Sequence, residues 1–150
     1  MKKPSLTLIA SLVAALFAAA PPVQAQQPKR PNIVMIVADD MGFADLGSYG
    51  SEIRTPNMDA LAKAGVRFTN FYTHASSSPT RSMLLTGVDT HLNGLGNMDQ
   101  WTAPNQWGLD GYEGVLNDRV ATLPQLLKGA GYHTYMVGKW HLGKQPDQIP

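Results

Sequence analysis

The sequence lacks cysteine entirely across its 150 residues. This absence excludes a disulfide framework, a thiolate metal site, an iron–sulfur cluster and a cysteine nucleophile as encoded. An excess of charge of one sign is lacking as well, because 12 basic and 11 acidic side chains leave a formal net charge of +1. That balance excludes a strongly basic nucleic-acid binder and an acidic tail, so we expect no nucleic-acid partner. The apolar content of 43% is typical of a globular protein.

The N-terminal apolar run is too short for an ordinary membrane-spanning helix. It extends from Leu6 to Ala20, whereas a spanning helix needs about 20 apolar residues. Two lysines precede it and small residues follow it, which is typical of a secretory signal peptide over residues 1–25. We therefore expect export by the secretion machinery, a periplasmic or secreted location and no stable membrane association; an uncleaved membrane anchor is the alternative. Residues 26–31 are a polar linker containing proline.

Three segments of the remaining chain have the composition of strands. Asn32 to Ala38 is a continuous apolar run rich in β-branched residues, which suits a strand buried on both faces. Val66 to Tyr72 alternates enough for a second strand, and Tyr132 to Val137 is a third. Helices are expected between them, so the pattern is that of an α/β fold.

The expected helices have recognisable ends. Thr55 and Pro56 offer a cap and a first-turn proline for a helix that continues to Gly65. Pro79 to Thr86 is predicted to be a short helix, and Thr122 can cap another from Leu123 to about Lys128. The segment from Val88 to Asn117 has little periodicity and is predicted to be a long loop, which in a compact domain is more often functional than idle.

Acidic side chains follow the first expected strand. In an open α/β sheet, ligands bind at the carboxyl ends of the strands. Asp39 and Asp40 lie at that end, and a hard divalent cation with oxygen ligands would neutralise them. Taken alone, the pair is more simply interpreted as a solvated turn.

A serine-rich segment follows the second expected strand. It runs from Ser76 to Arg81 and opens a helix, where a hydroxyl and free backbone N–H groups form a natural anion site. Arg81 adds a guanidinium that can bind an oxyanion through two bonds. The alternative is an ordinary helix cap with a solvated arginine.

Two further basic groups follow the third expected strand. Lys139 and His141 are two residues apart on a segment expected to be extended, so their side chains should point to the same side. Alone, they are no more than solvated charges at a strand end. Together with Arg81 and the aspartates, they suit a tetrahedral anion: lysine and arginine neutralise it, a metal polarises it and histidine moves a proton.

These motifs resemble those of the sulfatase family, and in particular the N-terminal part of a bacterial serine-type arylsulfatase. Ser77-Ser78-Pro79-Thr80-Arg81 matches the Cys/Ser-x-Pro-x-Arg signature of the family, and it is continued by Ser82 to Gly87. The other matching motifs, in family order, are Pro31-Asn32-Ile33-Val34, Asp39-Asp40-Met41-Gly42, Thr55-Pro56-Asn57-Met58-Asp59 and Gly138-Lys139-Trp140-His141-Leu142-Gly143. The resemblance therefore extends over nearly all of the chain from Pro31 onward.

The resemblance implies a fold and a chemistry. The expected fold is the N-terminal portion of an alkaline-phosphatase-like sandwich, with a mixed, largely parallel sheet flanked by helices. The residue at position 77 would be oxidised to Cα-formylglycine, whose hydrate attacks the sulfur of a sulfate ester to give a covalent sulfo-enzyme. Asp39 and Asp40, with the modified Ser77, would be calcium ligands. Arg81 would support the formylglycine, Lys139 would bind sulfate and His141 would contact the formylglycine hydroxyl.

Serine at the nucleophile position implies a particular maturation route. Ser77 is the only serine that stands two residues before Pro79 and four before Arg81. The resemblance implies that a serine-type maturase, in relatives an anaerobic radical enzyme, oxidises this residue before export. The expected substrate is a small-molecule sulfate ester.

Length separates this chain from the family. Residues 32–150 would be an incomplete catalytic domain, because the family implies further calcium ligands, a second lysine and a leaving-group histidine downstream. We expect residues 26–150 alone to fold weakly and to lack activity. The alternative functions are a phosphonate or phosphate ester hydrolase of the same superfamily, a non-catalytic secreted relative and an inactive fragment.

Overall fold

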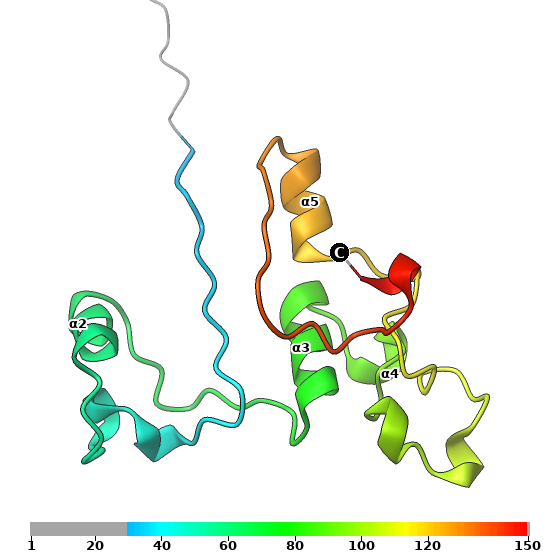
Figure 1. Cartoon of the computed structure of the whole chain (residues 1–150), viewed down its shortest axis with the longest axis horizontal. Coiled ribbons are helices and arrows are strands. Elements are labelled where there is room, and N and C mark those ends of the chain that lie inside the picture. Colours follow the sequence, from blue (N-terminus) through cyan, green and yellow to red (C-terminus); the bar gives the residue numbers. More distant parts are fainter. Residues whose placement is uncertain (1–29, 150) are drawn as a thin grey trace, which may run out of the picture. The chain divides into compact units, whose positions relative to one another are not determined.

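Short helices make up the regular structure of the described chain. A computed structural model describes residues 30–149, and the expected signal peptide lies outside the described residues. The α-helices, labelled in Figure 1, are α2 (Pro56–Ala64), α3 (Ser77–Thr86), α4 (Thr90–Asn93) and α5 (Leu123–Gly129). The 3-10 helices are η1 (Phe43–Asp45), η2 (Gly47–Tyr49), η3 (Asp99–Trp101), η4 (Pro104–Gln106) and η5 (Pro146–Gln148). None of the described helices is long and apolar enough to cross a membrane.

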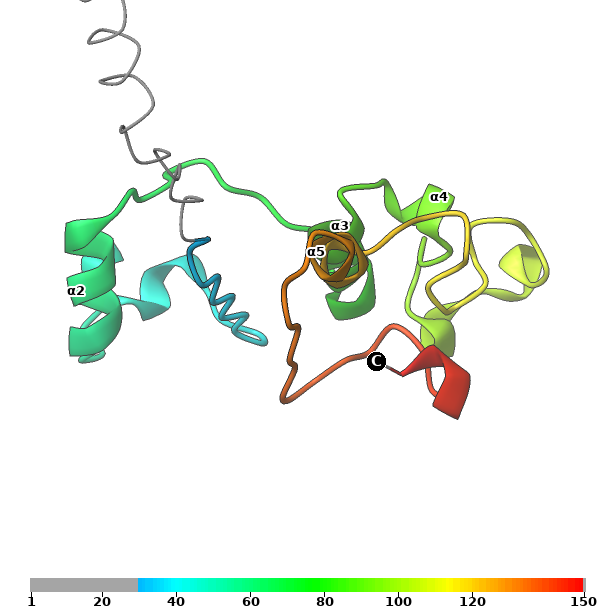
Figure 2. The ribbon, with the colours of Figure 1, turned by 90° about the horizontal axis from the view of Figure 1, so that it is seen from above.

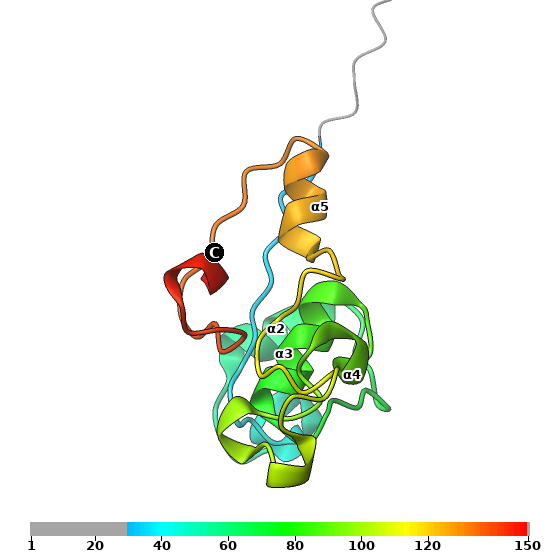
Figure 3. The same cartoon turned by 90° about the vertical axis from the view of Figure 1, so that its right-hand side faces the viewer.

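The chain divides into two units, Met1–Ile36 and Val37–Pro150. The described part of the first unit, residues 30–36, has no helix or strand and its side chains are exposed. The second unit carries every helix given above. Within it, α2 lies against η2 (Figure 2), and α3 contacts both α4 and α5 (Figure 3).

The three expected strands are absent from the described residues. Asn32–Ala38, Val66–Tyr72 and Tyr132–Val137 are neither helix nor strand, and no ladder joins them within the part that the structure describes. Their apolar side chains are exposed: Val34 retains 82% of its accessible surface and Val137 96%. A strand exists only through hydrogen bonds with a neighbouring strand, so an apolar run without such a neighbour remains irregular. The sheet of the expected α/β fold therefore stays a prediction.

The three expected helices are present, and their ends lie within two residues of those predicted. The helix expected from Pro79 begins two residues earlier, at Ser77. It ends at Thr86, and the N–H of the following Gly87 donates to Met83 O at 2.8 Å. Thr122 caps α5 as expected, within a box in which Thr122 N donates to Gln125 Oε1 at 2.8 Å. The loop expected over Val88–Asn117 contains α4, η3 and η4.

Thr55 precedes α2 but does not cap it with its side chain. Its hydroxyl accepts a hydrogen bond from Gly47 N at 2.8 Å and donates to Asp59 Oδ1 at 3.0 Å. Asp59 Oδ1 also accepts from Ser48 N at 2.7 Å. The hydroxyl and the carboxylate therefore fasten η2 to the first turn of α2.

The small core of the described residues lies around α3, α4 and the C-terminal segment. Its buried apolar side chains are Leu95, Met98 and Leu142, and its buried polar side chains are Ser78, Ser82, Thr90, Asn93 and Thr122. Every buried side-chain nitrogen or oxygen among the described residues has a hydrogen-bond partner. The helix that carries the serine motif, α3, thus packs on polar side chains whose buried nitrogen and oxygen atoms are all hydrogen-bonded.

Candidate functional site

Three segments of the second unit converge on Ser77 and Arg81. These two residues occupy the start of α3, and Asp39 lies before η1. Lys139 and His141 lie between α5 and η5. Ser77 is 38 positions from Asp39 in the sequence and 64 positions from His141, so the site is assembled by long-range contacts.

Helix geometry sets the relation between Ser77 and Arg81. Residues four apart on a helix are neighbours on its surface. Arg81 Nε accordingly donates to Ser77 Oγ at 3.2 Å. The Arg81 side chain is 12% exposed, and its Nη1 donates to the backbone oxygen of Lys139 at 2.8 Å. The guanidinium thus links the candidate nucleophile to the C-terminal segment.

Asp39 accepts hydrogen bonds from three side chains of the site. Arg81 Nη2 donates to Asp39 Oδ1 at 3.1 Å, and Lys139 Nζ donates to Oδ2 at 2.8 Å. Ser77 Oγ donates to Oδ1 over a longer distance of 3.4 Å. The hydrogen bond from Lys139, and then the one from Arg81, lowers the pKa of the Asp39 carboxyl. Asp39 is therefore the anion that balances the two cations.

His141 is the other titratable side chain beside the Ser77 hydroxyl. Its Nδ1 is 3.4 Å from Ser77 Oγ. Partial burial, followed by the charges of Lys139 and Arg81, lowers the pKa of His141. The neutral imidazole is thereby favoured, which is the form that can accept a proton.

Backbone conformation distinguishes two residues of the candidate site. Asp40, with φ of 56°, and His141, with φ of 62°, are the non-glycine residues with positive φ among those that the structure describes. The expectation that His141 lies on an extended segment is therefore wrong, because a positive φ turns the chain at that residue. The side chains of Lys139 and His141 nevertheless both reach the Ser77–Asp39 pair.

Comparisons with known proteins show the family of this chain. The sulfatase family model matches residues 31–149, which is most of the chain. The chain belongs to the sulfatase family. It is 56% identical over 127 residues to an uncharacterised sulfatase of Schizosaccharomyces pombe, covering 83% of this chain and 23% of that protein. It is 48% identical over 126 residues to an arylsulfatase of Klebsiella aerogenes, covering 84% and 27% respectively.

Human N-acetylgalactosamine-6-sulfatase is a third relative. It is 43% identical over 125 residues, covering 82% of this chain and 24% of the human protein. The chain thus spans about a quarter of the length of these relatives. Membership of the sulfatase family implies an alkaline-phosphatase-like α/β fold for the whole domain.

The residues expected to bind calcium offer the kind of oxygen ligand that this ion prefers, but fewer of them than it needs. Calcium prefers six to eight oxygen ligands. Asp39 and Ser77 bring carboxylate and hydroxyl oxygens together, and Asp40 follows in the chain. Asp40, however, is exposed and makes no hydrogen bond or ion pair with the described residues. The described part of the chain likewise holds no group of three or more metal-ligating His, Cys, Asp or Glu side chains.

His74 and His91 differ in their relation to the site. His74 Nδ1 accepts from Ser76 N at 3.2 Å, and its backbone oxygen accepts from Thr80 Oγ1 at 2.9 Å, so it supports the start of α3. His91 instead lies between Asp89 and Tyr112. His74 precedes the serine run by two residues, and this proximity is the only signal in the sequence for its role.

Proposed function

We propose that the full-length protein hydrolyses sulfate esters with a nucleophile built on residue 77. The observation that carries this proposal is the environment of Ser77 Oγ, which has Arg81 Nε at 3.2 Å and His141 Nδ1 at 3.4 Å. Arg81 and the nearby Lys139 place two cations around this hydroxyl, which suits a substrate that is itself a tetrahedral anion. Family membership and the names of the relatives, an arylsulfatase and an N-acetylgalactosamine-6-sulfatase, support sulfate as that anion.

The reaction assigns a separate task to each side chain. Lys139 and Arg81 bind the sulfate oxygens and neutralise charge that develops as the sulfur–oxygen ester bond breaks. His141, favoured in its neutral form, accepts a proton from the hydroxyl on residue 77. In the overall reaction one water molecule is consumed, and the alcohol and sulfate are released.

We further propose that Ser77 is first oxidised to Cα-formylglycine. A serine-type maturase would remove two electrons and two protons from the Cβ–Oγ group and transfer them to its own oxidant. The hydrated aldehyde carries two hydroxyls on one carbon, so that one can attack sulfur and the other can later release sulfate. An unmodified serine offers no comparable exit.

Calcium is the metal that we propose for this site. Asp39, Asp40 and the hydrated residue 77 would hold it, and it would supply positive charge that polarises the sulfate group. Asp39 is already the shared acceptor of Lys139 and Arg81. These two cations would then be available for the substrate in place of the carboxylate.

Export is part of the same proposal. The two lysines and the apolar run from Leu6 to Ala20 support a cleaved signal peptide and a periplasmic or secreted location. Amino-terminal sequencing of the protein from its native host tests it. A mature chain that starts at Gln26 is expected, and a chain that retains residues 1–25 contradicts the proposal.

The experiment for the reaction uses full-length protein purified from its native host. The peptide containing residue 77 should be lighter than the encoded peptide by the mass of two hydrogen atoms. Ser77→Ala should lower kcat for an aryl sulfate by at least about 10⁴-fold, as expected when a nucleophile is removed. Ser76→Ala is the matched control, because its hydroxyl contacts His74 rather than the site, and it should retain most of the activity.

Four outcomes contradict the proposal in different ways. An unmodified peptide from active protein removes the formylglycine step, and full activity of Ser77→Ala removes the assigned nucleophile. Turnover of a phosphonate monoester with no turnover of aryl sulfate would favour the related ester hydrolases. Unmodified protein that hydrolyses neither ester would favour a non-catalytic relative.

A further inference from the structure

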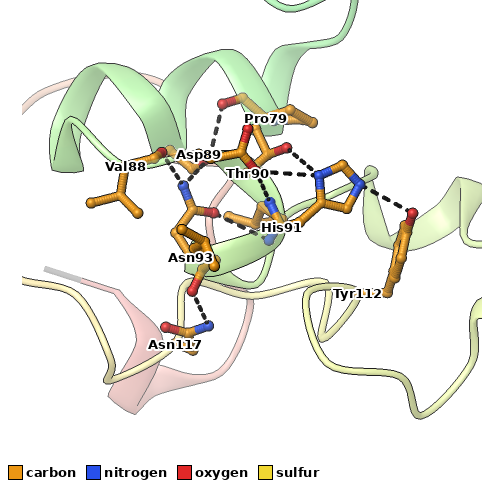
Figure 4. Close-up of polar contacts among 11 residues, drawn as sticks. Pro79, Val88, Asp89, Thr90, His91, Asn93, Tyr112 and Asn117 are labelled. Atoms are coloured by element: carbon orange, nitrogen blue, oxygen red, sulfur yellow. Dashed lines mark hydrogen bonds and ion pairs between the residues drawn. The ribbon is translucent and has the colours of Figure 1, made fainter.

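Asn93 is a buried amide whose side-chain nitrogen and oxygen are both hydrogen-bonded. It has no exposed surface. Its Nδ2 donates to Ser82 Oγ at 2.9 Å and to Val88 O at 3.0 Å, and its Oδ1 accepts from Leu95 N at 3.2 Å. Figure 4 shows Asn93 directed toward Val88 and the helix above it. Burial of a carboxamide is unfavourable unless its polar atoms are bonded, and here both N–H groups and the oxygen have partners.

The bonds of Asn93 continue into the turn of α3 that carries the candidate nucleophile. Ser82 is also fully buried, and its Oγ donates to Pro79 O at 2.8 Å. Pro79 follows Ser77 by two residues, and Ser82 follows Arg81 directly. An amide–hydroxyl–carbonyl chain therefore runs from Asn93 to the backbone between the two site residues.

The other side of Asn93 is fixed to different segments. Its backbone nitrogen donates to Asp89 O at 3.1 Å, and its backbone oxygen accepts from Asn117 N at 3.0 Å. These two bonds join Asn93 to Asp89, which precedes α4, and to Asn117. Neither bond involves a residue of α3. The amide is thus a fixed support against which α3 rests.

We propose that Asn93 is a positioning residue for the site. Through Ser82 and Pro79 it holds the first turns of α3 where Ser77 and Arg81 both reach Asp39. It touches none of the reacting atoms. The kinetic consequence rests on the proposed function, whereas the effect on α3 does not.

Asn93→Asp is the sharpest variant, because it keeps the size of the side chain and removes both donors. The carboxylate can still accept from Leu95 N, but it leaves Val88 O without its donor. The Ser82 hydroxyl has one hydrogen, so it can donate either to the carboxylate or to Pro79 O but not to both. Ser82→Ala breaks the same chain at its centre, and it decides the question if Asn93→Asp gives no soluble protein.

Asn97→Asp is the matched control. Asn97 Nδ2 donates to Trp101 O at 2.8 Å, and Asn97 Oδ1 accepts from Met98 N at 2.8 Å. The same replacement therefore removes the same kind of donor four residues further along the chain. Asn97 makes no hydrogen bond to α3 within the described part of the chain.

Hydrogen exchange in the full-length protein measures how readily α3 opens locally, without any substrate. Asn93→Asp and Ser82→Ala should each speed exchange of amides in Ser77–Thr86 by about tenfold, the change expected for one lost hydrogen bond. Exchange in Pro56–Ala64 should not change, nor should Asn97→Asp affect α3. Unchanged exchange in α3 for both Asn93→Asp and Ser82→Ala overturns the proposal.

Kinetics separate positioning from a loss of folded protein. At a temperature where all variants are folded, Asn93→Asp should lower kcat for an aryl sulfate by about tenfold and leave KM within about twofold. The double variant with Ser82→Ala should be no worse than Asn93→Asp alone, because both break one chain of bonds. An equal loss of kcat in Asn97→Asp overturns the proposal. Absence of turnover in the wild-type protein contradicts the proposed function instead, and exchange still decides the role of Asn93.

Discussion

Gly94 follows the last residue of α4, the buried Asn93. Replacing Gly94 with alanine should lower the free energy of unfolding substantially, although it adds only one methyl group. Its φ is 97°, a conformation that side chains rarely adopt. A Cβ added there would lie 2.4 Å from the backbone oxygen of Val115 and 3.1 Å from Asn117 Nδ2. A backbone oxygen cannot rotate away as the end of a flexible side chain can. Gly94→Ala must therefore move the turn that carries Asn93 or the segment that faces it.

Two separate effects set the size of the loss. A non-glycine residue with left-handed backbone geometry costs about 1–2 kcal/mol. Forcing an extra methyl group into a tightly packed place costs about 1–3 kcal/mol more. Gly94→Ala should therefore lower the free energy of unfolding by roughly 2–5 kcal/mol in total.

Two other glycines allow these effects to be measured separately. Gly87 ends α3 with φ of 68°, and a Cβ added there would have no atom within 4 Å. Gly87→Ala should therefore cost only the backbone effect of about 1–2 kcal/mol. Gly129 is the last residue of α5, has open space around it and does not have positive φ. Gly129→Ala should stabilise the protein by about 0.5–1 kcal/mol.

The assay is urea denaturation of the full-length variants, compared at constant m value. The expected order of stability, from highest to lowest, is Gly129→Ala, wild-type protein, Gly87→Ala and Gly94→Ala. Equal losses for Gly94→Ala and Gly87→Ala would refute the close approach to Val115. A neutral Gly87→Ala would refute the argument from backbone conformation.

Two further predictions concern the same region. Leu95 is fully buried, so Leu95→Ala should lower the free energy of unfolding by about 2–5 kcal/mol. Leu92 is exposed, so the free energy of unfolding of Leu92→Ala, measured in the same urea series, should differ from that of wild-type protein by no more than about 0.5 kcal/mol. The N–H of His91 donates to Asp89 and lowers the pKa of that carboxyl. Because the folded pKa lies below 3.8, this contribution to stability is present above pH 3.8 and is lost as the pH falls through the folded pKa. Asp89→Asn keeps an acceptor that does not titrate, so the difference in stability between variant and wild-type protein should change below pH 3.8; a constant difference would contradict the assignment.

The helices could be predicted from the sequence because their signals are local. The Thr122–Gln125 capping box and the glycine after α3 lie within a few residues of the ends that they specify. Thr55 is the instructive exception, since its hydroxyl bonds Gly47 and Asp59 rather than capping α2. A favourable cap residue predicts where a helix begins, but its side chain can hydrogen-bond to another part of the chain instead of to the helix end.

The strands could not be predicted in the same way. Asn32–Ala38 has the β-branched composition of a buried strand, yet in the described part of the chain it has no strand beside it. Composition reports a preference for burial, whereas pairing depends on segments far away in the sequence. The preference of residues 32–38 for burial can therefore be recognised although the described residues contain no sheet. The chain spans about a quarter of its relatives' length.

The candidate site combines both kinds of information. Ser77 and Arg81 could be placed together from their spacing alone, because four residues are about one helical turn and the helix brings Nε to Oγ. The expected sheet edge and the resemblance to the sulfatase family were the two reasons to join Asp39, Lys139 and His141 to them. These residues meet although no strand is present in the described residues. Charge explains this convergence: the Arg81 guanidinium, already held on α3, binds both the Asp39 carboxylate and the backbone oxygen of Lys139. Arg81 therefore joins the segments of the candidate site. The buried Asn93, which no pattern in the sequence indicated, is hydrogen-bonded through Ser82 to the helix that carries Arg81.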